Sequence, residues 1–182
     1  IPETGKQTRG KLINNLIKLS EDEKVSTIIK VRAHDEDNRE LFFITKKGIV
    51  KKTEARLFFH INKNGIRALT LKGEDELTYV GLTSGTKKNE VFIATRAGFA
   101  IRFSEEDVRS MGRTAAGVKG INLRKDDFVV SAAIVNPETD LDKLSVLTIT
   151  DEGYGKRTSL KEYKVQTRGG KGIINLKVND KT

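Results

Sequence analysis

The sequence predicts an all-β fold built from repeated four-stranded units. Two short patterns recur along the 182 residues at a period of about 53. Each unit contains several short runs rich in β-branched and aromatic residues, and no long amphipathic helical pattern is present. A unit of four short strands cannot bury both of its faces alone, so repeated units stack on their neighbours. We therefore expect stacked blades, as in a β-propeller or a related β-pinwheel.

Two anchor patterns define the repeat. The first is a glycine with a leucine six positions later, at steps of 55, 52 and 53 residues: Gly10 and Leu16, Gly65 and Leu71, Gly117 and Leu123, Gly170 and Leu176. The second is Thr-x-x-Gly after an apolar run, beginning at Thr45, Thr95 and Thr150. The order of the two patterns divides the single repeat domain, residues 1–182, into blades at roughly 10–64, 65–116 and 117–169, with the start of the next at 170–182. About three blades are fewer than a closed ring needs, so we expect part of a larger propeller, or one that completes its ring by association.

The middle unit shows the expected strands most clearly. They cover residues 66–71, 77–83, 91–95 and 99–103. The third and fourth strands are joined by a short turn that ends at Gly98, where a left-handed residue is expected. Matching hairpins are predicted at 41–45 with 49–53 and at 145–150 with 154–158.

A connection of about a dozen residues follows the fourth strand of each unit, at 54–64, 104–116 and 159–169. Ser104 and Ser159 begin segments with capping-box spacing, which is compatible with one helical turn. A polar loop is an equal alternative.

The charges suggest a polyanionic partner. There are 34 basic and 25 acidic residues, for a net charge of +9, which is typical of nucleic-acid-binding proteins and also of basic proteins with no such partner. Acidic clusters follow the first strand of each unit, at 21–23, 74–76 and 126–127. Basic residues lie in the turn before the fourth strand, in that strand, and near the next first strand. This separation predicts a positive stripe along one edge of the blades and acid at another.

A stripe repeated in every blade suits the evenly spaced phosphates of duplex DNA. The residues expected to contact DNA are Arg9, Lys11, Lys46, Lys47, Lys51, Lys52, Arg96, Arg102, Arg113, Lys119, Lys156, Arg157, Arg168 and Lys171. The alternative is that lysines protect an edge strand against aggregation, which would explain Lys51 and Lys52.

Several classes of function find no support in the sequence. There is no cysteine, which excludes a disulfide scaffold and fits a reducing compartment. No apolar run approaches the roughly 20 residues of a membrane helix, and no signal peptide is recognisable. His34 and His60 lack metal-ligand spacing, and Leu12 stands where a phosphate-binding loop needs serine or threonine. We expect no catalysis by this chain alone, no metal site and no cofactor.

Six segments carry a resemblance that covers essentially the whole chain: residues 75–77, 93–98, 102–104, 108–113, 117–121 and 153–158. They resemble the C-terminal domain of the A subunit of bacterial DNA gyrase, in the type IIA topoisomerase family. The resemblance implies a six-bladed β-pinwheel whose blades exchange strands and which binds and wraps duplex DNA around a positive rim. It implies partnership with the rest of the gyrase A subunit, and through it with the gyrase B subunit, in a cytoplasmic, nucleoid-associated enzyme. That holoenzyme uses ATP and magnesium elsewhere to introduce negative supercoils.

One loop resembles the family's signature sequence, the gyrase A box, which runs Gln, basic, Arg, Gly, Gly, basic, Gly. It comprises Gln166, Thr167, Arg168, Gly169, Gly170, Lys171 and Gly172. Thr167 departs from the pattern, and the loop lies later in the domain than the family's box does. From the residues themselves we expect an N–H nest in which Arg168 and Lys171 contact phosphate, while Gly170 mainly serves the fold.

Two alternatives remain open. The related C-terminal domain of topoisomerase IV lacks an intact box and often has fewer blades. The other alternative is a propeller that serves only as a platform for protein binding. Salt-dependent binding to long duplex DNA would separate this platform from the gyrase and topoisomerase IV domains.

Overall fold

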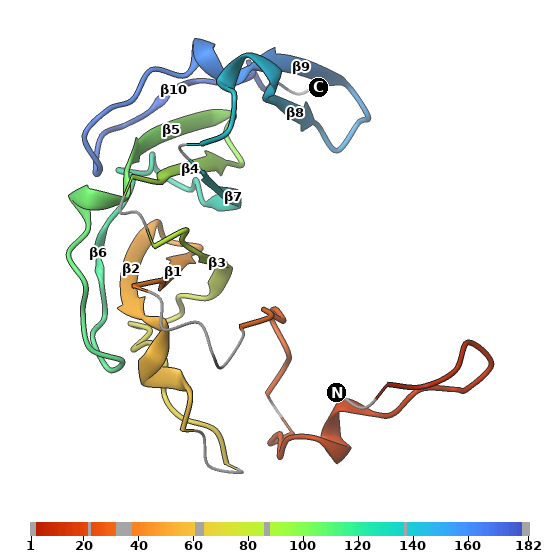
Figure 1. Ribbon diagram of the computed structural model, residues 1–182. Helices are drawn as coiled ribbons and strands as arrows, with labels where there is room; N and C mark the ends of the chain where they lie inside the picture. Colours follow the sequence, from red (N-terminus) through yellow and green to blue (C-terminus); the bar gives the residue numbers. More distant parts are fainter. Residues whose placement is uncertain are drawn as a thin grey trace.

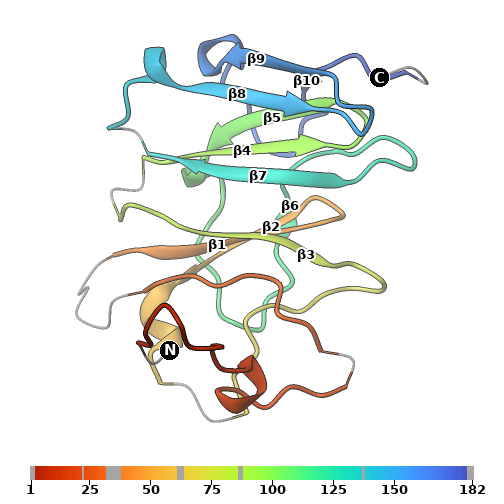
Figure 2. The same ribbon diagram turned by 90° about the vertical axis from the view of Figure 1, so that its right-hand side faces the viewer.

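The computed structural model describes residues 3–21, 23–31, 38–60, 64–85, 88–136 and 138–179. In these residues the chain is all-β, as the sequence predicts, and every helical segment is a short 3-10 turn. The sheets are stacked one after another along an arc (Figure 1). The side view shows their longer strands running across the stack, one sheet above the next (Figure 2).

Ten strands form three sheets. Sheet A has the order β3-β1-β2-β6, with bounds Leu77–Leu82, Glu40–Thr45, Ile49–Glu54 and Val118–Lys119. Sheet B has the order β10-β5-β4-β7, with bounds Ile173–Ile174, Phe99–Ser104, Glu90–Thr95 and Val129–Val135. Sheet C contains β8 (Ser145–Ile149) and β9 (Gly155–Ser159). Strands β3, β7 and β8 lie on the inner side of the arc, and β6 and β10 lie on its outer side (Figure 1).

The three predicted hairpins are present, but the other strands do not stay within their sequence units. β3 belongs to the middle unit and pairs with β1 of the preceding unit, and β7 pairs with β4 in the same way. The first strands of later units, β6 and β10, complete the outer edges of sheets A and B. The four strands of one unit therefore do not form one sheet, and the blades exchange strands, as the family resemblance implies. A short turn fixes hairpin pairing locally, whereas the longer connections leave the partner to be chosen by tertiary packing.

Two further expectations about local structure have different outcomes. The expected strand at 66–71 is absent from the described residues. Of the two possibilities after the hairpins, a helical turn or a polar loop, the structure has a 3-10 turn in each unit: η2 (Ala55–Phe58), η3 (Glu105–Asp107) and η5 (Leu160–Glu162). Ser104 and Ser159 cap two of these turns, because their hydroxyl oxygens accept hydrogen bonds from Glu106 N–H and Lys161 N–H. The remaining 3-10 turns of the described residues are η1 (Ile13–Asn15) and η4 (Leu141–Lys143).

The main core lies between sheets A and B. Phe42, Ile44 and Val50 of sheet A pack against an apolar set from sheet B and the segments beside it: Val91, Ile93, Ile101, Phe103, Val108, Ile121 and Val129. A second core joins sheet B to sheet C, where the rings of Phe92 and Tyr163 meet edge to face at 5.0 Å. Each fully buried side chain of this size contributes about 1.5–3 kcal/mol, so the contacts between sheets hold the arc together.

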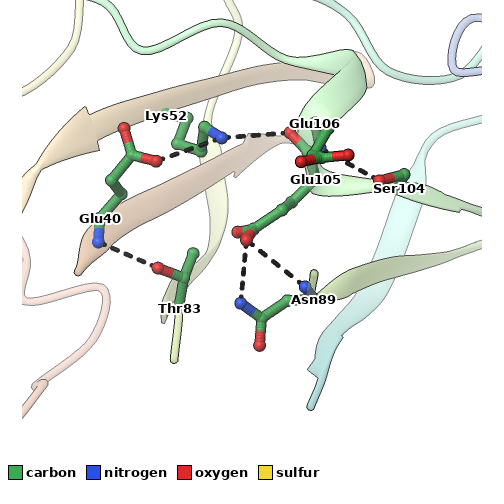
Figure 3. Close-up of polar contacts among 7 residues, drawn as sticks. All are labelled: Glu40, Lys52, Thr83, Asn89, Ser104, Glu105 and Glu106. Carbon is green, nitrogen blue, oxygen red and sulfur yellow. Dashed lines mark hydrogen bonds and ion pairs between the residues drawn. The ribbon is translucent and has the colours of Figure 1, made fainter. Parts of the chain in front are cut away.

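A buried cation ties each four-stranded sheet to the next 3-10 turn. Lys52 Nζ lies 3.1 Å from the Glu40 carboxylate and donates a hydrogen bond to the Glu105 carbonyl of η3 (Figure 3). Arg102, at the equivalent position of sheet B, pairs with Glu90 and donates to the Leu160 and Tyr163 carbonyls, each at 3.1 Å. Breaking one partner of such a buried pair costs about 3–5 kcal/mol.

Lys51 is a second buried cation in β2, with 0% of its surface exposed. Its ammonium donates to the carbonyls of Ala68 and Arg113 and lies 5.6 Å from the centroid of the Phe43 ring. Burial, with a smaller effect from the charge of Arg113, lowers the pKa of Lys51 from 10.5 to about 8.

Two stretches, 108–125 and 163–179, contain β6 and β10 on the outer side of the arc, and we call them the outer segments (Figure 1). They are bonded to one another and to the unit before them. Gly169 N–H donates to Gly120 O at 2.6 Å, and Asn122 N–H donates to Gly170 O at 2.8 Å. One unit earlier, Thr70 N–H donates to Ala115 O at 3.4 Å. The outer segments therefore form a continuous hydrogen-bonded chain across successive units.

The surroundings of two glycines correct the register of the repeat. A Cβ at Gly117 would lie 2.5 Å from Val50 O, and a Cβ at Gly172 would lie 2.5 Å from Ala100 O. Gly117 and Gly172 also share left-handed φ angles of 92° and 71°. The glycine equivalent to Gly117 is therefore Gly172, and its assignment to Gly170 is wrong by two residues. Because many loop lengths place some glycine nearby, the sequence pattern alone could not separate the two.

We expect Gly172→Ala to be destabilising and Gly170→Ala to be nearly neutral. At Gly172 an alanine would combine a left-handed backbone with a clash against a carbonyl oxygen, at a cost of about 1–3 kcal/mol. At Gly170 the added carbon would meet atoms at 3.5 Å, which is ordinary contact. Urea unfolding of both variants measures the difference, and equal losses would contradict the corrected register.

Lys51 should make stability rise with pH on the alkaline side. Its pKa is lowered to about 8 in the folded chain, so between about pH 8 and 10.5 the unfolded chain binds more protons. In that window Lys51 should add up to about 1.4 kcal/mol per pH unit to the free energy of unfolding. Lys51→Met keeps the side-chain length and removes the titration. Unfolding curves of both proteins at several pH values test this, and parallel pH profiles would show that Lys51 is not the cause.

Candidate nucleic-acid interface

The outer segments are basic and free of acid. Together they contain nine basic residues and no aspartate or glutamate: Arg109, Arg113, Lys119, Arg124, Lys125, Lys164, Arg168, Lys171 and Lys177. Seven of these side chains are exposed, and Arg113 and Arg168 are half-buried. The exposed cations, with no acid among them, give these segments a positive charge.

Only part of the predicted set of DNA contacts lies on this surface. Arg113, Lys119, Arg168 and Lys171 belong to the outer segments. Arg9 and Lys11 are exposed in the N-terminal segment, and Lys156 and Arg157 are exposed on β9. The structure thus does not bring all the predicted cations into one stripe.

The basic hairpin turns lie against the acidic clusters. Lys46 forms an ion pair with Glu76 at 3.2 Å, and Lys47 N–H donates to the Asp75 carboxylate. In the next unit Ala97 N–H donates to the Asp127 carboxylate at 2.8 Å, beside the exposed Arg96. The expected separation of acid from base is therefore wrong at this end of the sheets. Strand exchange is the reason, because it brings the acidic loop of one unit to the hairpin turn of the unit before.

Three of the predicted contacts are not on the surface at all. Lys51, Lys52 and Arg102 are at most 5% exposed and have carbonyl or carboxylate partners inside the protein. Their expected exposure is wrong. The edge-strand explanation for Lys51 and Lys52 is wrong as well, since β2 is flanked by β1 and β6.

The box-like loop is fastened to the preceding unit. Arg168 donates from its backbone N–H to the Asp107 carboxylate, from Nε to Asp107 O at 2.7 Å, and from Nη1 to Lys119 O at 3.0 Å. Gly169 N–H is also used, by Gly120 O. Arg168 and Gly169 therefore take part in the fold, whereas the expectation that Gly170 mainly serves the fold is wrong. Lys171 is the exposed cation of this loop.

Sequence reasoning missed Arg109, Arg124, Lys125, Lys164 and Lys177 as members of the surface. The signal that could have found them is the absence of acid from 108–125 and from 163–179, in a chain with 25 acidic residues. Counting basic residues near the repeat anchors did not show it.

Other kinds of site find no support in the described part of the chain. No group of three or more histidine, cysteine, aspartate or glutamate side chains there could hold a metal ion. Nor does any helix within those residues have the length and apolar character needed to cross a membrane.

Comparison with known proteins identifies the family. The family model described as "DNA gyrase C-terminal domain, beta-propeller" matches residues 1–32, 39–84, 89–136 and 145–181. The DNA gyrase A subunit of Lawsonia intracellularis is 46% identical over 182 residues, which are 100% of this chain and 22% of that protein. The same subunit of Staphylococcus epidermidis is 43% identical over 181 residues, 100% of this chain and 20% of that protein. The chain therefore spans about a fifth of the length of these curated relatives.

Solved structures show the same fold. The C-terminal domain of DNA topoisomerase IV superimposes with a TM-score of 0.81 and 32% identity, covering 91% of this chain and 49% of that one. A DNA gyrase A C-terminal domain superimposes with a TM-score of 0.78 and 25% identity, covering 96% and 56%. The family model matches most of this chain, and gyrase A subunits match all of it, so this chain belongs to the family of DNA gyrase C-terminal domains.

Proposed function

We propose that the chain binds duplex DNA through its phosphate backbone, without sequence preference, along the outer segments. The observation that carries this is that the outer segments contain nine basic residues and no aspartate or glutamate. Lysine and arginine at a phosphate displace condensed counterions, and this effect supplies affinity that does not depend on base sequence. The described residues offer only 3-10 turns as helices, so none of them reads the major groove as a recognition helix does.

The repeat spaces these cations regularly. Arg109 precedes Ser110, which forms a β-bridge with the buried Lys52. In the next unit Lys164 precedes Val165, which forms the same kind of bridge with the buried Arg102. Both side chains are exposed, so successive units present a cation at the same place on the arc. Equivalent charges on two successive units favour a duplex that contacts both units over one that touches a single unit.

In the whole protein, this binding would wrap a DNA segment and support ATP-dependent negative supercoiling. The partners in that activity would be the rest of the gyrase A subunit, and through it the gyrase B subunit. ATP and magnesium would act in those other parts, in the cytoplasm at the nucleoid, while this chain supplies no catalytic group. Family membership supports these inferences.

The exposed cations of the outer segments should account for most of the salt dependence of binding. We expect the triple substitution of Arg109, Lys119 and Lys164 by alanine to flatten the plot of log affinity against log salt by about 0.9 per lost contact, or about 2.7 in total. The matched control replaces Lys46, Lys47 and Arg96, which removes the same charge from the hairpin turns and should change the slope much less. Fluorescence anisotropy with long duplexes of unrelated sequence measures both.

Three outcomes would contradict the proposal. The chain could fail to bind duplex DNA in a salt-dependent way, which would favour a platform for protein binding. The control triple could lose as much as the outer triple. One DNA sequence could also lose far more affinity than another, which would show direct readout of bases.

A further inference from the structure

We propose that Arg124 is a positioning residue that holds Lys171 in place on the DNA-binding surface. The inference rests on the proposed function and concerns three elements. Arg124 follows β6, Phe99 begins β5, and Lys171 lies in the box-like loop before β10. The side chain of Arg124 joins the other two.

The geometry of Arg124 fits a clamp. Its guanidinium carbon lies 3.1 Å from the centroid of the Phe99 ring, and its Nη1 donates to the Lys171 carbonyl at 3.1 Å. A planar guanidinium can stack on a ring and donate in its own plane at the same time, which an ammonium cannot do. Arg124 therefore fixes the peptide of Lys171 relative to β5.

The bond from Arg124 holds the residue of the box-like loop that follows the two glycines bonded to the preceding outer segment. Gly169 and Gly170 are already bonded to the preceding outer segment through Gly120 and Asn122. Lys171 is the next residue, and it precedes the sharp backbone turn at Gly172, with φ of 71°. Its carbonyl bond to Arg124 extends the fastening to the exposed cation itself. A lysine whose backbone is already held at the surface loses less conformational entropy when its side chain meets a phosphate.

The alternative is that Arg124, which is itself exposed, only adds a phosphate contact of its own. The two roles differ in what happens when no charge is removed. Phe99→Ile takes away the ring under the guanidinium and keeps every charge. Isoleucine is a suitable replacement because Ile49 begins β2 at the equivalent position of sheet A.

A double-mutant cycle of Phe99→Ile and Lys171→Ala tests the proposal, with affinity for a duplex of about 40 base pairs and mixed sequence measured on the 182-residue chain at about 0.1 M salt. Lys171→Ala should weaken binding about five- to tenfold and lower the salt slope by about 0.9, as expected for one phosphate contact. Phe99→Ile should weaken binding by a similar factor. In the Phe99→Ile background, Lys171→Ala should cost less than about twofold.

Two further variants keep the test decisive. Arg124→Lys keeps the charge but loses the planar donor, so it should weaken DNA binding as Phe99→Ile does. If Phe99→Ile lowers the urea midpoint of unfolding, Arg124→Lys takes its place in the cycle. Lys125→Ala removes a charge next to Arg124, and its effect should add to that of Lys171→Ala.

Wild-type affinity in Phe99→Ile and Arg124→Lys, or an undiminished effect of Lys171→Ala in their backgrounds, would overturn the positioning role. If the unmodified chain does not bind the duplex, the proposed function fails instead.

Discussion

Backbone hydrogen bonding between successive units is the constraint on which the rest of the structure depends. Buried N–H and carbonyl groups must be paired, and β3, β7, β6 and β10 find their partners in hairpins of other units. Sheets A and B therefore cannot be completed from the residues of a single unit. Stability is shared between neighbours, as in other repeat proteins, and the outer segments acquire their fixed course along the arc as a consequence of this pairing.

Strand exchange also decides which charges reach the surface. Glu40 and Lys52, and likewise Glu90 and Arg102, meet across a hairpin and are covered by the next 3-10 turn. At the equivalent places of sheet C stand Ser145 and Arg157, and Arg157 is exposed. In sheets A and B the buried pair is thus formed by a basic residue of the fourth strand and an acid 12 positions before it. The repeated spacing of acid and base is visible in the sequence, where Lys52 and Arg102 are nevertheless interpreted as DNA contacts.

Glu105 shows a residue-level departure that the repeat does not predict. Ala55 and Leu160 occupy its place in the other units, and all three are buried. One oxygen of Glu105 accepts hydrogen bonds from Asn89, while the other has no hydrogen-bond partner among the described residues (Figure 3). An unpaired buried carboxyl oxygen is costly, so this position is less favourable for stability than its apolar equivalents. The contact of its own carbonyl with Lys52 leaves the tie between the sheets intact.

The fold was predictable where its causes are local. The contacts of the basic residues in the outer segments depend instead on residues far apart in the sequence. The hairpins, their glycine turns and the 3-10 turns follow from short stretches of sequence, whereas the bond of Arg168 to Asp107 joins residues 61 apart. A guanidinium has several donors in one plane, so Arg168 and Arg124 can bond carbonyls of other segments while still contributing positive charge near the surface. An ammonium on a flexible stem serves better as a mobile point charge, and Lys171 is exposed. A surface built in this way ties the spacing of its charges to the stacking of its sheets, so that a change in either one alters the other.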